Sequence, residues 1–142
     1  MHPFLEARVA DWMSRQVVTV TPATTLAELE GVFERHDFNG LPVLEAHVLA
    51  GVVTKFDVLR AFVFTPQNLV PPYAQLARLT TGQLMTRDPI TFQPDAPLTR
   101  VLQTLVDFRV KSFPVLDGSR LVGIIAREDV VRALRRTVHA AG

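Results

Sequence analysis

Two heptapeptides of one pattern lie 72 residues apart in this chain: Gly51-Val52-Val53-Thr54-Lys55-Phe56-Asp57 and Gly123-Ile124-Ile125-Ala126-Arg127-Glu128-Asp129. Each starts with a glycine and a short apolar run of strand length, and each continues into a segment with apolar residues at helical spacing. Each heptapeptide therefore predicts a β-strand that leads directly into an α-helix, with an aspartate in the first helical turn.

The same spacing relates other segments, which indicates an internal repeat. The further matched pairs, all in one ungapped register, are Met13 with Met85, Thr19-Val20-Thr21-Pro22 with Thr91-Phe92-Gln93-Pro94, Leu41-Pro42-Val43-Leu44 with Phe113-Pro114-Val115-Leu116, and Asp57-Val58-Leu59-Arg60-Ala61 with Asp129-Val130-Val131-Arg132-Ala133.

Each copy predicts the order strand, helix, strand, strand, helix. The elements predicted for the first copy are a strand at Val17–Val20 that ends before Pro22, a helix from Thr25 to about His36, strands at Leu41–Leu44 and Val48–Val53, and a helix over Lys55–Phe62. Those predicted for the second copy are a helix opened by Asp95 with Pro97 in its first turn, strands at Phe113–Leu116 and Leu121–Ile125 joined by a turn at Asp117-Gly118, and a helix from Arg127 to about Val138.

These elements predict a mixed α/β (α+β) fold of two β-α-β-β-α repeats. Half of the chain is too small to bury a sufficient core alone, so we expect the repeats to pack through their sheets about a pseudo-two-fold axis. The predicted divisions are an N-terminal extension 1–8, the first repeat 9–62, a linker 63–80 with Pro66, Pro71 and Pro72 and a short helix at Tyr73–Leu79, the second repeat 81–138, and a tail 139–142.

The composition excludes several classes of protein. The chain has 142 residues, 48% of them hydrophobic and 20% charged, with no cysteine and a formal net charge of +1. These values are typical of a folded globular protein and exclude a disulfide framework, a zinc finger and a thiol nucleophile. We expect a soluble, cytoplasmic protein that binds neither nucleic acid nor membrane, because neither a basic field nor a membrane-length apolar segment is present.

The first junction carries residues that suit a nucleotide. Gly51 allows another group to approach the backbone closely, and Thr54 at the start of a helix offers a hydroxyl and free backbone N–H groups to an anion. The carboxylate of Asp57 can accept two hydrogen bonds from a vicinal diol such as a ribose. Lys55 and, at the second junction, Arg127 can offset phosphate charge.

Helix capping explains the same pattern. Thr54-x-x-Asp57 has the spacing of a capping box, in which both side chains bond backbone N–H groups of the first helical turn. At the second junction, Ala126 has no hydroxyl although Asp129 remains. The sequence therefore leaves open whether these aspartates bind a ligand or cap a helix.

Taken together, the repeat order, the opening Val9-Ala10-Asp11-Trp12-Met13, the Leu-Pro-Val-Leu strand and the Gly-x-x-Thr-x-x-Asp junction resemble tandem cystathionine-β-synthase (CBS) domains, known as a Bateman module. The resemblance covers roughly residues 9–62 and 81–134. It implies a regulatory module that binds an adenosine-containing ligand (AMP, ADP, ATP or S-adenosylmethionine) in clefts between the repeats, forms a homodimer and signals to an effector protein in trans. For the homodimer, we expect the helical faces Val58-Leu59-Phe62 and Val130-Val131-Leu134.

The resemblance also implies roles for individual residues. Asp57 and Asp129 would bind ribose, Thr54 would contact ribose or phosphate, and Lys111 would contact phosphate. The remaining expected contacts come from the backbone around the adenine and from the positions at the start of each Pro-Val strand: Val17, Val18, Thr19, Pro89, Ile90, Thr91, Asn39, Gly40, Leu41, Pro42, Ser112, Phe113 and Pro114. Gly51, Lys55 and Arg127 complete the expected set. Ala126 departs from the usual Ser or Thr, which sets the Asp129 site apart.

Other functions are less well supported by the residues. The four histidines show no metal-ligand spacing, and no nucleophile has a partnered base, so we expect neither a metal nor an enzyme. A nucleic-acid-binding role for Arg132, Arg135 and Arg136 competes with a structural one, because cations near a helix C-terminus suit the helix dipole. The main alternative is a structural or protein-interaction module that binds no ligand.

Overall fold

The computed structural model describes residues 2–63 and 73–141, which form two compact units. Unit 1 takes Met1–Val17 and Pro89–Gly142, and unit 2 takes Val18–Asp88. Both units combine helices with a β-hairpin, so the mixed α+β class predicted from the sequence is confirmed. The prolines expected in the linker (Pro66, Pro71 and Pro72) lie outside the described residues.

Unit 2 is built on an antiparallel sheet of order β1-β2-β3. Its elements are α2 (Leu26–Arg35), β1 (Gly40–Glu45), β2 (Val48–Thr54), α3 (Lys55–Ala61), α4 (Tyr73–Leu76), α5 (Thr81–Leu84) and β3 (Thr86–Arg87). The helix expected at Tyr73–Leu79 is thus limited to its first residues. The hydroxyl of Tyr73 donates to Glu30 Oε2 at 2.9 Å, and this hydrogen bond to an acidic side chain raises the pKa of Tyr73.

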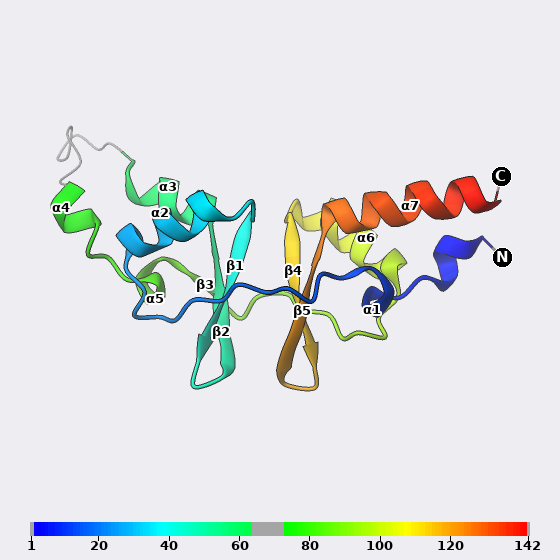
Figure 1. The fold of residues 1–142 in the computed structure, drawn as a ribbon, viewed down its shortest axis with the longest axis horizontal. Helices are drawn as coiled ribbons and strands as arrows, with labels where there is room; N and C mark the ends of the chain where they lie inside the picture. Colours follow the sequence, from blue (N-terminus) through cyan, green and yellow to red (C-terminus); the bar gives the residue numbers. More distant parts are fainter. Residues whose placement is uncertain (1, 64–72, 142) are drawn as a thin grey trace. The chain divides into compact units, whose positions relative to one another are not determined.

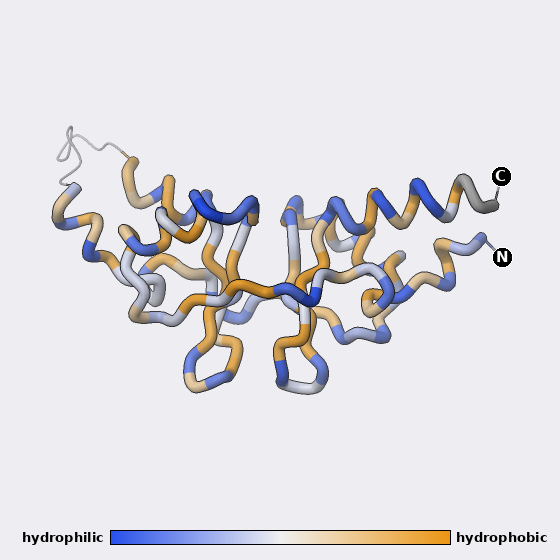
Figure 2. Tube along the Cα trace, in the orientation of Figure 1, coloured by the Kyte–Doolittle hydropathy of each residue, from blue (hydrophilic) through white to orange (hydrophobic). Residues whose placement is uncertain are grey.

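Unit 1 repeats this plan with a hairpin of β4 and β5. Its elements are η1 (Pro3–Glu6), α1 (Val9–Trp12), α6 (Leu98–Phe108), β4 (Ser112–Asp117), β5 (Arg120–Ala126) and α7 (Arg127–Ala141). Although η1 and α1 begin the chain and α7 ends it, Figure 1 shows them beside each other, and both pack on α7. In both hairpins most hydrophobic residues lie in the strands, and hydrophilic residues gather at the connecting turns (Figure 2).

Each unit contains a short helix that the sequence repeat assigns to the other copy: α1 lies in unit 1 and α5 in unit 2. In unit 1, the N–H of Val9 donates to the carbonyl of Ala96 at 3.0 Å. The equivalent bond in unit 2 runs from the N–H of Thr81 to the carbonyl of Thr24 at 2.7 Å. The segment with α1 begins the first sequence repeat but packs with the second, and the segment with α5 begins the second repeat but packs with the first.

Prolines limit the first strand of each repeat to a single bridge. Val20 donates its N–H to Pro42 O at 3.1 Å and accepts from Leu44 N at 2.9 Å, in a parallel bridge to Val43. The next bonds of a parallel ladder would need the N–H groups of Pro22 and Pro42, which proline lacks. The run expected as a strand at Val17–Val20 is therefore extended but pairs only at Val20. Phe92 forms the same bridge with Val115 in unit 1.

The two long helices that follow these bridges start differently. Thr25 caps α2 and forms a reciprocal capping box with Glu28. The expected opening of the equivalent helix by Asp95 is wrong, because α6 begins at Leu98 and Pro97 occupies its N-cap position without a side-chain hydrogen bond. Proline serves there because the first N–H groups of a helix have no intrahelical acceptor and its φ is already suitable.

Each unit has its own hydrophobic core, and the two cores contain part of the expected dimer faces. Val58 belongs to the core of unit 2 with Leu26 and Leu29, and Val130 belongs to the core of unit 1. Both are therefore packing residues. On the outer sides of the same helices, Leu59 is 68% exposed and Val131 is 62% exposed. Within the described residues, none of the helices has the length and apolar character needed to cross a membrane.

Candidate functional site

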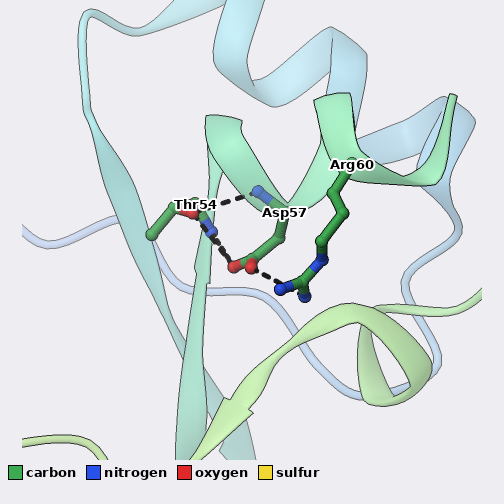
Figure 3. Close-up of polar contacts among 3 residues, drawn as sticks. All are labelled: Thr54, Asp57 and Arg60. Carbon is green, nitrogen blue, oxygen red and sulfur yellow. Dashed lines mark hydrogen bonds and ion pairs between the residues drawn. The ribbon is translucent and has the colours of Figure 1, made fainter. Parts of the chain in front are cut away.

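In unit 2, the junction of β2 and α3 is closed by a complete capping box (Figure 3). The Asp57 Oδ2 atom accepts from the Thr54 N–H at 2.8 Å and from the Thr54 hydroxyl at 3.0 Å. In return, the Asp57 N–H donates to Thr54 Oγ1 at 3.2 Å. The capping alternative read from the sequence is therefore present in the structure, and Asp57 is held in one orientation by two donors.

The other oxygen of Asp57 faces an arginine from the next helical turn (Figure 3). Arg60 Nη2 donates to Asp57 Oδ1 at 3.2 Å. The Asp57 side chain is only 6% exposed, whereas that of Arg60 is 59% exposed and its guanidinium lies over the ring of Phe56, 5.8 Å from the centroid. Arg60 thus covers the outer oxygen of a buried carboxylate from the solvent side.

Several expected site residues meet at this junction. The Lys55 N–H donates to the Asn39 carbonyl at 3.3 Å, and Gly40 pairs with Thr54 across the hairpin. Asn39 and Gly40 are half-buried and Lys55 is exposed. Backbone pairing thus places the start of β1 next to the start of α3.

The equivalent junction in unit 1 lacks the hydroxyl but keeps the carboxylate. Asp129 Oδ2 accepts from the Ala126 N–H at 2.8 Å, and Asp129 Oδ1 accepts from Arg132 Nη2 at 3.1 Å. Arg127 donates its N–H to the Lys111 carbonyl at 3.0 Å, and both of these basic side chains are exposed. This junction therefore carries two exposed cations, although Arg127 also pairs with Glu128 at 3.4 Å.

Arg132 also contacts the N-terminal segment. The same Nη2 atom lies 3.2 Å from the carbonyl oxygen of Trp12, and the guanidinium lies over the Trp12 ring at 5.7 Å from the centroid. Arg136 lies over the same ring at 5.8 Å. Two of the three arginines considered for nucleic acid are therefore engaged with Trp12.

The close approach predicted at the two junction glycines is made by the chain itself. A Cβ atom added at Gly51 would lie 2.4 Å from the carbonyl oxygen of Thr86, and one added at Gly123 would lie 2.7 Å from that of Ser14. Thr86 belongs to β3, and Ser14 pairs with Ile124. The close packing of these segments therefore explains why glycine occupies both positions.

Burial shows where two other expected residues lie. Leu41 and Phe113, expected to face a ligand, are each 1% exposed, and their side chains pack in the cores of their units. Their contacts with a ligand stay predictions. Pro42 and Pro114 are also buried. Other expected residues lie half-buried or exposed along the extended segments that lead to the Val20 and Phe92 bridges: Val18 and Thr19 in unit 2, and Pro89, Ile90 and Thr91 in unit 1. Val17 ends the N-terminal segment of unit 1, and Ser112 pairs with Ala126.

Sequence reasoning missed Arg60 and the contacts of Arg132 and Trp12. The available signal was Asp-x-x-Arg at both junctions, since residues three apart on a helix lie on one face. Across the described part of the chain, no group of three or more His, Cys, Asp or Glu residues is placed to hold a metal ion.

Comparison with known proteins decides the family. The CBS domain family matches residues 9–64 and 82–136, which is most of the chain. The chain belongs to the CBS domain family. The two matches correspond to the two copies of the repeat, and the CBS-domain resemblance read from the sequence is confirmed.

Curated relatives carry the CBS pair within proteins of different size. The A-adding tRNA nucleotidyltransferase of Geobacter sulfurreducens is 30% identical over 87% of this chain, which spans only 13% of that enzyme. The CBS domain-containing protein YhcV of Bacillus subtilis is 28% identical over 86% of this chain, which spans 81% of that protein.

Two similar solved structures contain adenosine compounds. CBSX2, a CBS-pair protein of Arabidopsis thaliana, has been solved in complex with AMP; it is 26% identical, with a TM-score of 0.77 over 91% of this chain and 96% of CBSX2. The CBS domain pair of protein MJ0100, in complex with 5′-methylthioadenosine and S-adenosyl-L-methionine, is 28% identical, with a TM-score of 0.73 over 89% of this chain and 98% of that pair.

Proposed function

We propose that this CBS protein is a regulatory module that binds an adenosine-containing ligand, an adenine nucleotide or S-adenosylmethionine, through its two strand–helix junctions. The observation that carries the proposal is the placement of a buried carboxylate at each junction, Asp57 at 4% and Asp129 at 9% exposure, each with one oxygen turned to an exposed arginine. The complexes of CBSX2 with AMP and of the MJ0100 pair with S-adenosyl-L-methionine support the ligand class.

The carboxylates suit a ribose in their chemistry. At Asp57, Oδ2 is held by Thr54, while Oδ1 accepts only from the flexible side chain of Arg60 among the described residues. An ionised carboxylate can accept about four hydrogen bonds, so Asp57 can accept from a ligand while Arg60 stays in place. The hydroxyls of a ribose then donate to Asp57 beside the guanidinium.

Charge favours an anionic group on the ligand near unit 1. Lys111 and Arg127 lie on neighbouring backbone positions at that junction, whereas the equivalent positions in unit 2 are Asn39 and Lys55. A phosphate gains charge-assisted hydrogen bonds from such cations. In this proposal, the phosphates of a nucleotide contact Lys111 and Arg127.

The proposed regulatory output acts through protein partners. A ligand shifts a conformational equilibrium only by its difference in affinity between the states, and an effector protein reads the favoured state in trans. The exposed Leu59 and Val131 side chains support a homodimer that uses the outer sides of α3 and α7. We place this activity in the cytoplasm.

Thermal unfolding in the presence of AMP, ADP, ATP and S-adenosylmethionine tests the proposal. A ligand at about 100 times its Kd adds roughly 2.7 kcal/mol of stability, which raises the Tm of a domain of this size by several degrees. Asp57→Asn keeps an acceptor for the Thr54 N–H and removes the charge, so we expect it to fold and to lose most of the ligand-induced shift at that junction. An equal shift in wild type, Asp57→Asn and Asp129→Asn would contradict ribose binding by these residues.

A ligand-free structural module is the second candidate, and one observation favours it. Both carboxylates already have cap and arginine partners in this structure. This candidate predicts that Asp57→Ala lowers the Tm and that none of the four compounds raises it at millimolar concentration.

A further inference from the structure

The two junctions hold their carboxylates by different means. Asp57 Oδ2 is fixed by both the N–H and the hydroxyl of Thr54. Asp129 Oδ2 has the N–H of Ala126 at 2.8 Å, and alanine supplies no hydroxyl. Unit 1 therefore lacks one of the donors that orient the equivalent carboxylate in unit 2.

The arginine that contacts the carboxylate has more partners in unit 1 than in unit 2. Arg60 contacts Asp57 and the ring of Phe56, and both partners belong to its own helix α3. Arg132 contacts Asp129 on its own helix α7 but also the carbonyl oxygen and ring of Trp12 on α1. Its side chain is 42% exposed, compared with 59% for Arg60.

We propose that Trp12 and Arg132 are positioning residues for Asp129, and that they replace the hydroxyl missing at Ala126. A guanidinium is planar and presents its donors in a fixed geometry, so fixing it on a carbonyl and an aromatic face also fixes the carboxylate that it contacts. Trp12 thus acts on Asp129 through Arg132, from a segment far away in the sequence.

A consequence follows for the N-terminal segment. A ribose that donates to Asp129 Oδ1 shares this oxygen with Arg132, and so also acts on the contact between Arg132 and Trp12. Binding at Asp129 and docking of α1 on α7 are then coupled, and the coupling is reciprocal. This consequence rests on the proposed function, whereas the positioning of Asp129 in the free protein does not.

The free protein tests the positioning directly, because Trp12 is the single tryptophan of the chain. Asp129→Asn removes the charge that holds Arg132, so we expect the fluorescence emission of Trp12 to change in the absence of any ligand. Asp57→Asn is the matched control in unit 2, and we expect it to leave the emission unchanged. An unchanged emission in Asp129→Asn would overturn the proposal.

A double-mutant cycle separates positioning from general packing. Arg132→Lys keeps the charge but cannot contact Asp129, the Trp12 carbonyl and the ring together, so we expect a Tm about 3 °C lower. In the Ala126→Thr background, the restored hydroxyl holds Asp129, and we expect the same substitution to lower the Tm by less than half as much. Equal losses in the two backgrounds would overturn the replacement of the hydroxyl by Arg132.

Ligand binding gives the third readout, measured at 25 °C on variants whose circular dichroism matches that of wild type. For a compound that binds through Asp129, we expect Arg132→Lys and Trp12→Leu each to weaken affinity about fivefold, and Ala126→Thr to restore most of it. Arg60→Lys is the matched control for unit 2, with less than about a twofold effect because Thr54 still holds Asp57. If no compound binds wild type, the proposed function fails, while the fluorescence and the Tm cycle still decide the positioning.

Discussion

The β2–α3 junction of unit 2 and the β5–α7 junction of unit 1 share one backbone plan and differ in the side chains that support it. In both, a glycine lies against the backbone of a distant segment and a buried aspartate accepts from the residue before the helix. Both carboxylates also accept from an arginine, but Thr54 completes the cap in unit 2, whereas in unit 1 the arginine, Arg132, also contacts Trp12. The comparison teaches that the close packing of segments is common to both junctions, while the polar support of the carboxylate differs between them.

The largest expected effect comes from replacing the glycine that both junctions share. Gly51→Ala places a Cβ atom 2.4 Å from the Thr86 carbonyl oxygen, and Gly123→Ala places one 2.7 Å from that of Ser14. Because the neighbour in each case is backbone, β3 or the Ser14 segment must move, and we expect each variant to lose about 2–3 kcal/mol of unfolding free energy. Urea unfolding monitored by circular dichroism measures the loss.

Gly31→Ala is the matched control for this pair. Gly31 lies in α2, where an added Cβ would meet only the end of the flexible Arg35 side chain at 3.3 Å. Alanine favours the helix by about 0.8–1 kcal/mol over glycine, so this variant should be more stable than wild type. A loss at Gly51 no greater than the change at Gly31 would show that the packing of β3 does not set the junction.

Exchanging the residues before the two helices, Thr54 and Ala126, tests the difference between the junctions and is expected to have a smaller effect. Thr54→Ala removes the hydroxyl that accepts from the Asp57 N–H, and we expect it to cost about 1 kcal/mol. Ala126→Thr introduces that hydroxyl opposite Asp129, and we expect a gain, although one smaller than the loss at Thr54 because Arg132, itself in contact with Trp12, already orients the carboxylate. Thermal unfolding of the two variants and of the double exchange measures both effects.

A gain at Ala126 equal to the loss at Thr54 would contradict the support by Arg132. In that case the two junctions would be independent caps that differ only by drift. Thr25→Ala, at the capping box of α2, gives the reference loss for a threonine cap in the same protein.

The hairpin turns provide the smallest expected effect. The β1–β2 turn places Ala46 at φ 50° and His47 at φ 66°, whereas the β4–β5 turn has Gly118 at φ 63°. Positive φ strains residues other than glycine and suits Asn-Gly, so Ala46→Asn with His47→Gly should raise stability by about 0.5–1 kcal/mol. Gly118→Ala should lower it by a similar amount, and thermal unfolding measures both; opposite signs would show that these turns do not limit stability.

Much of the fold followed from the sequence because the repeat supplied two independent readings of each element. The hairpins and the helices after them were predicted within a few residues, since their apolar runs end at turn residues or polar caps. The first strands were limited by Pro22 and Pro42, whose missing N–H groups stop the ladder, and that effect depends on which strands pair. The order of elements along the chain also did not predict that α1 packs with the second repeat and α5 with the first.

At the candidate site, the sequence predicted the local capping contacts, while contacts between distant segments were not predicted. The spacing of Thr54 and Asp57 predicted the capping box, and the structure contains it. Leu41 and Phe113 precede proline in strands and were expected at a ligand, yet the pleat turns both side chains into the cores. The contact of Arg132 with Trp12 joins segments that only the three-dimensional structure brings together.

Isothermal titration of the wild-type protein, Asp57→Asn, Asp129→Asn and the double variant with the compound that gives the largest thermal shift tests ribose binding by the junction carboxylates most directly. We expect saturable binding to wild type, a loss of at least tenfold in affinity in one or both single variants, and no measurable binding to the double variant. Wild-type affinity in a folded double variant would contradict the central claim, because the ligand would then bind without either carboxylate.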